Sequence, residues 1–65
     1  MTRAHATLIF TMLHKARGKL ARLAVLYRRD ITAPQVERTM RLANWWEHRW
    51  TQVPPRLAMR VARGV

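Results

Sequence analysis

The feature that most constrains this chain is a row of apolar residues near its N-terminus, spaced four, three, four, three and four positions apart. On an α-helix, this spacing places every member of the row in one narrow stripe along the helix axis. The stripe, called the apolar seam below, consists of Ile9, Leu13, Ala16, Leu20, Leu23 and Tyr27. The sequence therefore predicts a helix over residues 4–28 whose seam packs against a partner.

A second helix is expected over residues 34–50. Thr32 offers a hydroxyl cap, Pro34 suits a first helical turn, and Gln35 lies three residues after the cap. One broad face of this helix is apolar and comprises Val36, Thr39, Met40, Leu42, Ala43, Trp46 and Trp50. Because the connection between the helices is short, we expect an antiparallel hairpin whose two apolar faces meet.

A third, short helix is expected over residues 55–63, because Pro54 and Pro55 end the preceding one. Leu57 and Val61 should face inward. The polar side then carries a row of arginines at i, i+4 and i+7, namely Arg56, Arg60 and Arg63. A helix of this length is marginal alone, so it either docks on the hairpin or orders on a partner. Residues 1–65 thus form one small all-α domain.

The charge balance predicts an anionic partner. The 65 residues include 13 Lys and Arg against 3 Asp and Glu, a formal net charge of +10. A compact chain with this charge repels itself, and an anionic ligand would relieve the repulsion. Most of the cations are Arg, whose planar guanidinium suits phosphate and carboxylate groups, although a GC-rich genome would produce the same excess.

A chain this short buries little apolar area and needs further stabilisation. Disulfides are excluded because there is no cysteine, and the scattered His5, His14 and His48 do not suggest a metal site. We therefore expect no cofactor, and either a homodimer through the apolar seam or a place in a larger assembly.

Enzymatic function is not expected. The acids Asp30, Glu37 and Glu47 are not spaced as general acid and base partners, and the chain has no serine, no cysteine and no Gly-rich phosphate loop. No apolar stretch is long enough to cross a membrane, and no cleaved secretory signal is expected. The first 29 residues, which are basic and contain no acid, resemble an organellar transit peptide in composition, but such peptides are Ser-rich and this chain has no serine. The expected location is the cytoplasm.

Trp45 is the most informative single residue. The apolar face of the second helix leaves it pointing outward, with Arg38, Arg41 and Arg49 on the same side. An indole beside guanidinium groups suits a nucleic acid, since bases stack on aromatic rings and arginines hold phosphates. The same residue types make hot spots in protein interfaces, and the arginines could also simply cover the indole.

Glu47 and its neighbours have a structural interpretation. Trp46 and Trp50 lie on the apolar face and are expected in the core. Glu47 approaches the interface between the helices, where its expected partner is Arg17 or Arg28 of the first helix or of a second protomer.

Two classes of function follow. In the first, a nucleic acid lies along Trp45 with its neighbouring arginines and along the C-terminal arginine row. It also contacts the positive side of the first helix, which is formed by Lys15, Lys19 and Arg22. In the second, the chain is a small adaptor or inhibitor, of the kind that phages and plasmids encode, and docks on an acidic protein surface. A membrane-surface peptide is a weaker third reading, because the two apolar faces match each other. The long helices and paired prolines do not fit a helix-turn-helix motif.

Overall fold

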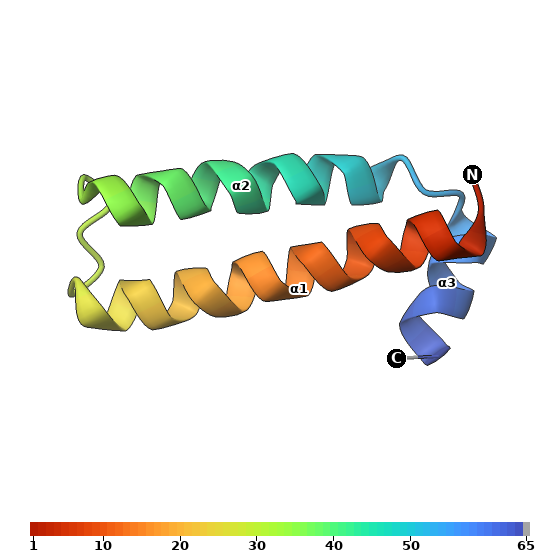
Figure 1. The fold of residues 1–65 in the computed structure, drawn as a ribbon, viewed down its shortest axis with the longest axis horizontal. Coiled ribbons are helices and arrows are strands. Elements are labelled where there is room, and N and C mark those ends of the chain that lie inside the picture. Colours follow the sequence, from red (N-terminus) through yellow and green to blue (C-terminus); the bar gives the residue numbers. More distant parts are fainter. Residues whose placement is uncertain (65) are drawn as a thin grey trace.

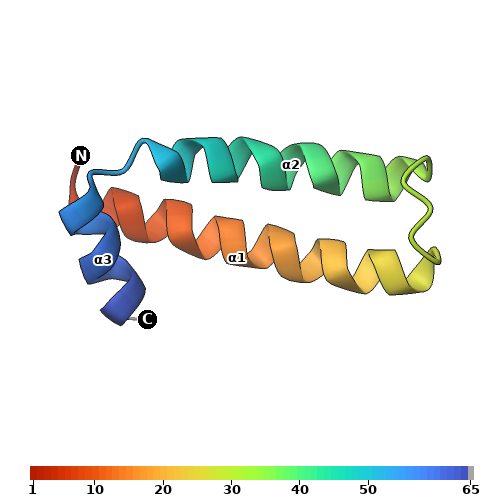
Figure 2. The ribbon, with the colours of Figure 1, turned by 180° about the vertical axis from the view of Figure 1, so that it is seen from behind.

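The computed structural model describes residues 1–64, which form three helices and no strand. They are α1 (Arg3–Leu26), α2 (Pro34–Thr51) and α3 (Pro55–Gly64). Figures 1 and 2 show α1 and α2 running antiparallel, with α3 turned across the N-terminal end of α1. The prediction of an all-α hairpin with a short third helix is confirmed, and the helix ends differ from the expected ones by two residues at most.

Both ends of α1 have local causes. At the N-terminus, the hydroxyl oxygen of Thr2 accepts a hydrogen bond from the backbone N–H of His5 at 3.2 Å. At the C-terminus, Arg28 and Arg29 have φ angles of 52° and 61°, in the left-handed region that costs a non-glycine residue roughly 1–2 kcal/mol. The N–H of Arg29 donates to the carbonyl of Ala24 at 2.6 Å. The helix therefore stops at Leu26, two residues before the predicted end.

The cap predicted for α2 is wrong. The N-cap residue is Ala33, which makes no side-chain hydrogen bond to the helix. The hydroxyl and backbone N–H of Thr32 instead donate to the Asp30 carboxylate, at 2.6 and 2.9 Å. These two bonds, the hydroxyl's first, hold the pKa of Asp30 below its ordinary value. Thr32 therefore stabilises the turn between the helices rather than the start of α2.

The apolar seam packs against α2, as predicted. Its N-terminal half is buried, with Ile9, Leu13 and Ala16 no more than 4% exposed. The C-terminal half, consisting of Leu20, Leu23 and Tyr27, is half-buried. On α2 the buried residues of the helix are Val36, Thr39 and Ala43. Leu42, which was also predicted for this face, is 46% exposed, because one residue along a helix turns a side chain by about 100° from Ala43.

A cluster of hydrophobic side chains forms where all three helices meet. Its buried members are Ala6, Ile9, Val53 and Val61, and the partly buried side chains packed against it include Phe10, Trp46, Trp50 and Leu57. The rings of Phe10 and Trp50 lie 5.1 Å apart between centroids, which joins α1 to the end of α2. Val61 is 2% exposed, so α3 docks on the hairpin through the side predicted to face inward.

Candidate functional site

Two rows of side chains, one on each long helix, form the candidate site. On α1 the members lie at i, i+4 and i+7, and on α2 at i, i+7 and i+11, so each row keeps to one side of its helix. The members are Lys15, Lys19 and Arg22 on α1, and Arg38, Trp45 and Arg49 on α2. We call these six residues the cationic face. All are exposed except Arg49, which is half-buried.

The two rows meet at a groove between the helices. This groove has a volume of about 340 Å³ and is lined by Lys19 and Leu23 of α1 and by Gln35, Arg38 and Thr39 of α2. Its uncharged polar groups are engaged, because the Thr39 hydroxyl donates to the Gln35 carbonyl at 2.9 Å and the Tyr27 hydroxyl donates to Gln35 Oε1 at 2.7 Å. Lys19 and Arg38 therefore give the groove its positive charge.

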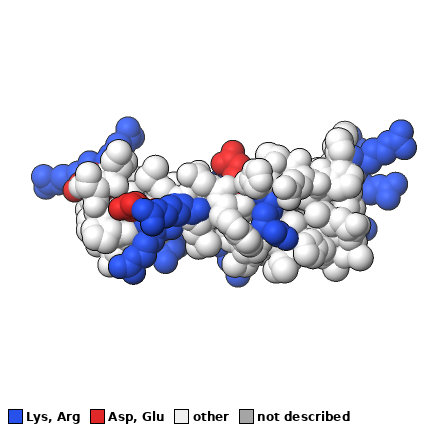
Figure 3. Space-filling view, turned by 90° about the horizontal axis from the view of Figure 1, so that it is seen from above, with Lys and Arg blue, Asp and Glu red and all other residues white. Residues whose placement is uncertain are grey.

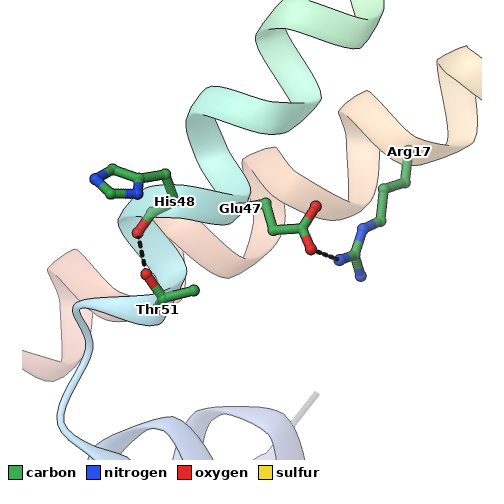
Figure 4. Close-up of polar contacts among 4 residues, drawn as sticks. All are labelled: Arg17, Glu47, His48 and Thr51. Carbon is green, nitrogen blue, oxygen red and sulfur yellow. Dashed lines mark hydrogen bonds and ion pairs between the residues drawn. The ribbon is translucent and has the colours of Figure 1, made fainter.

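Two other exposed arginines of the hairpin, outside the cationic face, are held in ion pairs. Glu47 lies 3.5 Å from Arg17, which confirms one of the two partners predicted for it (Figure 4). Glu37 pairs with Arg41 one turn further along α2. Both pairs are exposed, so each contributes at most about 1 kcal/mol to stability. Their main consequence is electrostatic, since neither pair involves a member of the cationic face.

Trp45 points outward, as predicted, and is 51% exposed. Trp46 meets its ring edge-on, with 4.6 Å between centroids, and the Arg49 guanidinium carbon lies 4.9 Å from the centre of the Trp45 ring. Of the three arginines expected around this indole, the structure places only Arg49 against it. Arg38 lines the groove, and Arg41 turns to Glu37.

The C-terminal arginine row lies apart from the groove. Arg56, Arg60 and Arg63 are all exposed on α3, at the end of the hairpin away from the turn (Figure 1). Viewed from the α2 side, Lys and Arg appear at both ends of the molecule and between them, separated by uncharged surface and by acidic side chains (Figure 3). Basic side chains thus occur at intervals along the length of the molecule.

Other polar clusters are local. The Thr51 hydroxyl donates to the His48 carbonyl at 2.6 Å (Figure 4), and the Gln52 amide lies 3.4 Å from the His48 ring. Within residues 1–64, no three His, Cys, Asp or Glu side chains come close enough together to hold a metal ion.

A second hollow of about 460 Å³ is lined by Ile31, Thr32, Glu37, Met40, Arg41 and Asn44. The Glu37–Arg41 ion pair belongs to its wall, so this hollow lacks the unpaired charge of the groove.

All six members of the cationic face could be named from the sequence, but the groove that joins its rows could not. The available signal was that Lys19 directly precedes the seam residue Leu20, while Arg38 directly precedes the buried Thr39. Each cation therefore flanks the helix interface on its own helix.

Comparisons with known proteins give no relatives. No protein-family model matches the chain, and searches of curated proteins and of solved structures find no match. None of the helices in residues 1–64 combines the length and the apolar character needed to cross a membrane.

Proposed function

We propose that this chain is a small, basic, non-enzymatic protein of the cytoplasm that binds nucleic acid through the cationic face. The observation that carries the proposal is that ion pairs neutralise some exposed cations of the hairpin and leave the groove cations without an acid. Arg17 and Arg41 are paired with acids, whereas Lys19 and Arg38 face a shared groove that no acid lines. Unpaired cations aligned on one surface are the electrostatic footprint of a phosphate-backbone ligand.

The dimensions of the rows suit such a ligand. At 1.5 Å per residue, the α1 row from Lys15 to Arg22 is about 10 Å long, and the α2 row from Arg38 to Arg49 is about 16 Å long. Each strand of a duplex carries one charge for about every 3.4 Å of the helix axis, so each row is long enough to contact more than one phosphate. The exposed arginines of α3 extend the positive surface beyond the end of α2.

The test is the salt dependence of oligonucleotide binding, measured by fluorescence anisotropy on the full chain. Binding should weaken with a log–log slope of roughly −0.9 per phosphate contact on duplex, or −0.7 on single strands. Two double variants that remove the same charge provide a matched comparison. Lys19→Gln with Arg38→Gln should flatten the slope by about 1 to 2 units, whereas Arg17→Gln with Arg41→Gln should change it much less.

If both double variants weaken oligonucleotide binding equally, only net charge matters, and the cationic face is not a specific binding site. Absence of binding to any oligonucleotide at low salt would reject the proposed function as a whole. Both variants should keep the helical circular dichroism of the parent, because all four side chains are exposed.

An acidic protein surface is the second candidate ligand. It is favoured by large apolar side chains exposed on the hairpin, since Leu8 is 53%, Leu42 46% and Trp45 51% exposed. Tryptophan and arginine together are typical of protein hot spots, and an adaptor or inhibitor would use them in this way. Binding to poly-glutamate that equals or exceeds binding to oligonucleotides would favour this candidate over nucleic acid.

Self-association also belongs to the proposal. The seam that the sequence assigns to a dimer is covered by α2 within one chain, so a dimer of intact hairpins must use another surface. Val25, Leu26 and Ile31 at the turn are 82%, 70% and 64% exposed and supply apolar area for it. A melting temperature that rises with protein concentration, and that loses this dependence in Leu26→Gln with Ile31→Gln, would support such a dimer. Monomer mass with concentration-independent melting would reject it.

A further inference from the structure

We infer that the ligand of the cationic face is single-stranded nucleic acid, with one base stacked on Trp45. This inference rests on the proposed function and names the class of nucleic acid that the same site takes. It starts from Trp45, a large aromatic side chain that stays 51% exposed in the middle of a row of cations.

The indole of Trp45 is held in place while much of it stays open. Trp46 meets it edge-on at an interplanar angle of 82°, and Arg49 lies over the ring. These two contacts restrict the rotation of the indole, so little freedom remains to be lost when a base binds. A base stacked on the exposed part of the ring would share the indole with the Arg49 guanidinium. Stacking on an exposed aromatic ring is the main sequence-tolerant way in which proteins hold single strands.

The side chains next to Trp45 combine charged and apolar groups, as a single strand combines phosphates and bases. Along one side of α2, the residues at i, i+4, i+7 and i+11 are Arg38, Leu42, Trp45 and Arg49. Leu42 and Trp45 are both about half exposed, so this row alternates charged ends with an apolar centre. A single strand presents phosphates together with bare base faces. A duplex presents phosphates on the outside and hides the faces of its stacked bases.

The width of the hairpin also disfavours a duplex. Lys19 and Arg38 come from different helices, so a ligand that contacts both must lie against the broad side of the hairpin. Two helices side by side, each about 10–12 Å across, are roughly 20 Å wide. The major groove of B-DNA is only about 12 Å wide and admits a single helix. The broad side can follow the outer phosphates of a duplex, but Trp45 then contacts no base face.

The experiment compares full-length chain binding to single strands of about ten nucleotides, oligodeoxythymidine and oligouridine, with binding to duplexes of the same length. At matched salt, at least one single strand should bind on the order of tenfold more tightly than its duplex. Trp45→Ala should weaken single-strand binding by between about fivefold and a hundredfold and leave duplex binding nearly unchanged. Trp45→Phe, which keeps an aromatic ring, should retain most of the affinity.

Ile31→Ala is the matched control, because Ile31 is 64% exposed in the turn, outside the cationic face and the α3 arginine row, and should bind like the parent. The strand preference of the unaltered chain needs no variant, so it remains decisive even if Trp45→Ala loses helicity. Equal, salt-dependent binding to single strands and duplexes would overturn this inference and leave the proposed function standing. Failure to bind either form would reject the proposed function itself.

Discussion

Replacing Leu13 with alanine tests how the hairpin is held together. Leu13 is 2% exposed and lies in the half of the apolar seam that α2 covers. Truncating a leucine in such a position costs about 2–5 kcal/mol, through lost burial and the cavity left behind. At roughly 0.05–0.15 kcal/mol per residue, a chain of 65 residues has a total stability of only about 3–10 kcal/mol. One substitution should therefore remove a large part of it.

Leu8→Ala is the matched control on the same helix. Leu8 is 53% exposed, so the same truncation there should change stability by about 0.5 kcal/mol or less. Urea unfolding followed by circular dichroism reports both variants. With a slope near 1 kcal/mol per molar urea, Leu13→Ala should lower the midpoint by about 2 M or more, or leave the chain unfolded in buffer. Equal midpoints for Leu13→Ala and Leu8→Ala would refute the packing of α1 against α2.

Three further perturbations have defined outcomes. Gly18→Ala should stabilise the chain by up to about 1 kcal/mol, because an added Cβ meets nothing within 4 Å and alanine is the better helix former; a lower melting temperature would contradict this. Asp30 has a lowered pKa, so its contribution to stability is complete above its ordinary value of 3.8 and is lost as the pH falls through the lower folded-state value. Acid titrations of stability should therefore differ between the parent and Asp30→Asn in that range, and superimposable curves would show that the turn contributes nothing. Replacing all three α3 arginines with glutamine should flatten the salt dependence of oligonucleotide binding by about 2 to 3 units at unchanged melting temperature, and an unchanged slope would place α3 outside the interface.

The fold was predictable because its strongest determinant is periodic. The spacing of the seam places Ile9 and Leu13 on one face of α1 whatever the neighbouring helix does, and both are buried. The turn was less predictable, because short polar side chains have several partners within reach. Thr32 was a reasonable cap for α2, but Asp30 two residues earlier accepts hydrogen bonds from both its hydroxyl and its N–H.

The candidate site was predictable where one helix determines it. The outward direction of Trp45 follows from the apolar face of α2 alone. The position of Arg41 does not follow from the helix phase, because Glu37, four residues before it, attracts its guanidinium away from the indole. The groove lined by Lys19 and Arg38 depends on how α1 and α2 are rotated against each other, which side-chain packing across the interface decides.

The most direct test of the central claim is a nuclear magnetic resonance titration of isotope-labelled chain with a short single-stranded oligonucleotide. The largest shifts should fall on the amides around Lys19 and Arg38 and on the indole N–H of Trp45. The side-chain guanidinium signals of Arg17 and Arg41, which are paired with acids, should move much less than that of Arg38. Shifts centred on Arg17 and Arg41, or no shifts at low salt, would contradict the claim that the cationic face binds nucleic acid.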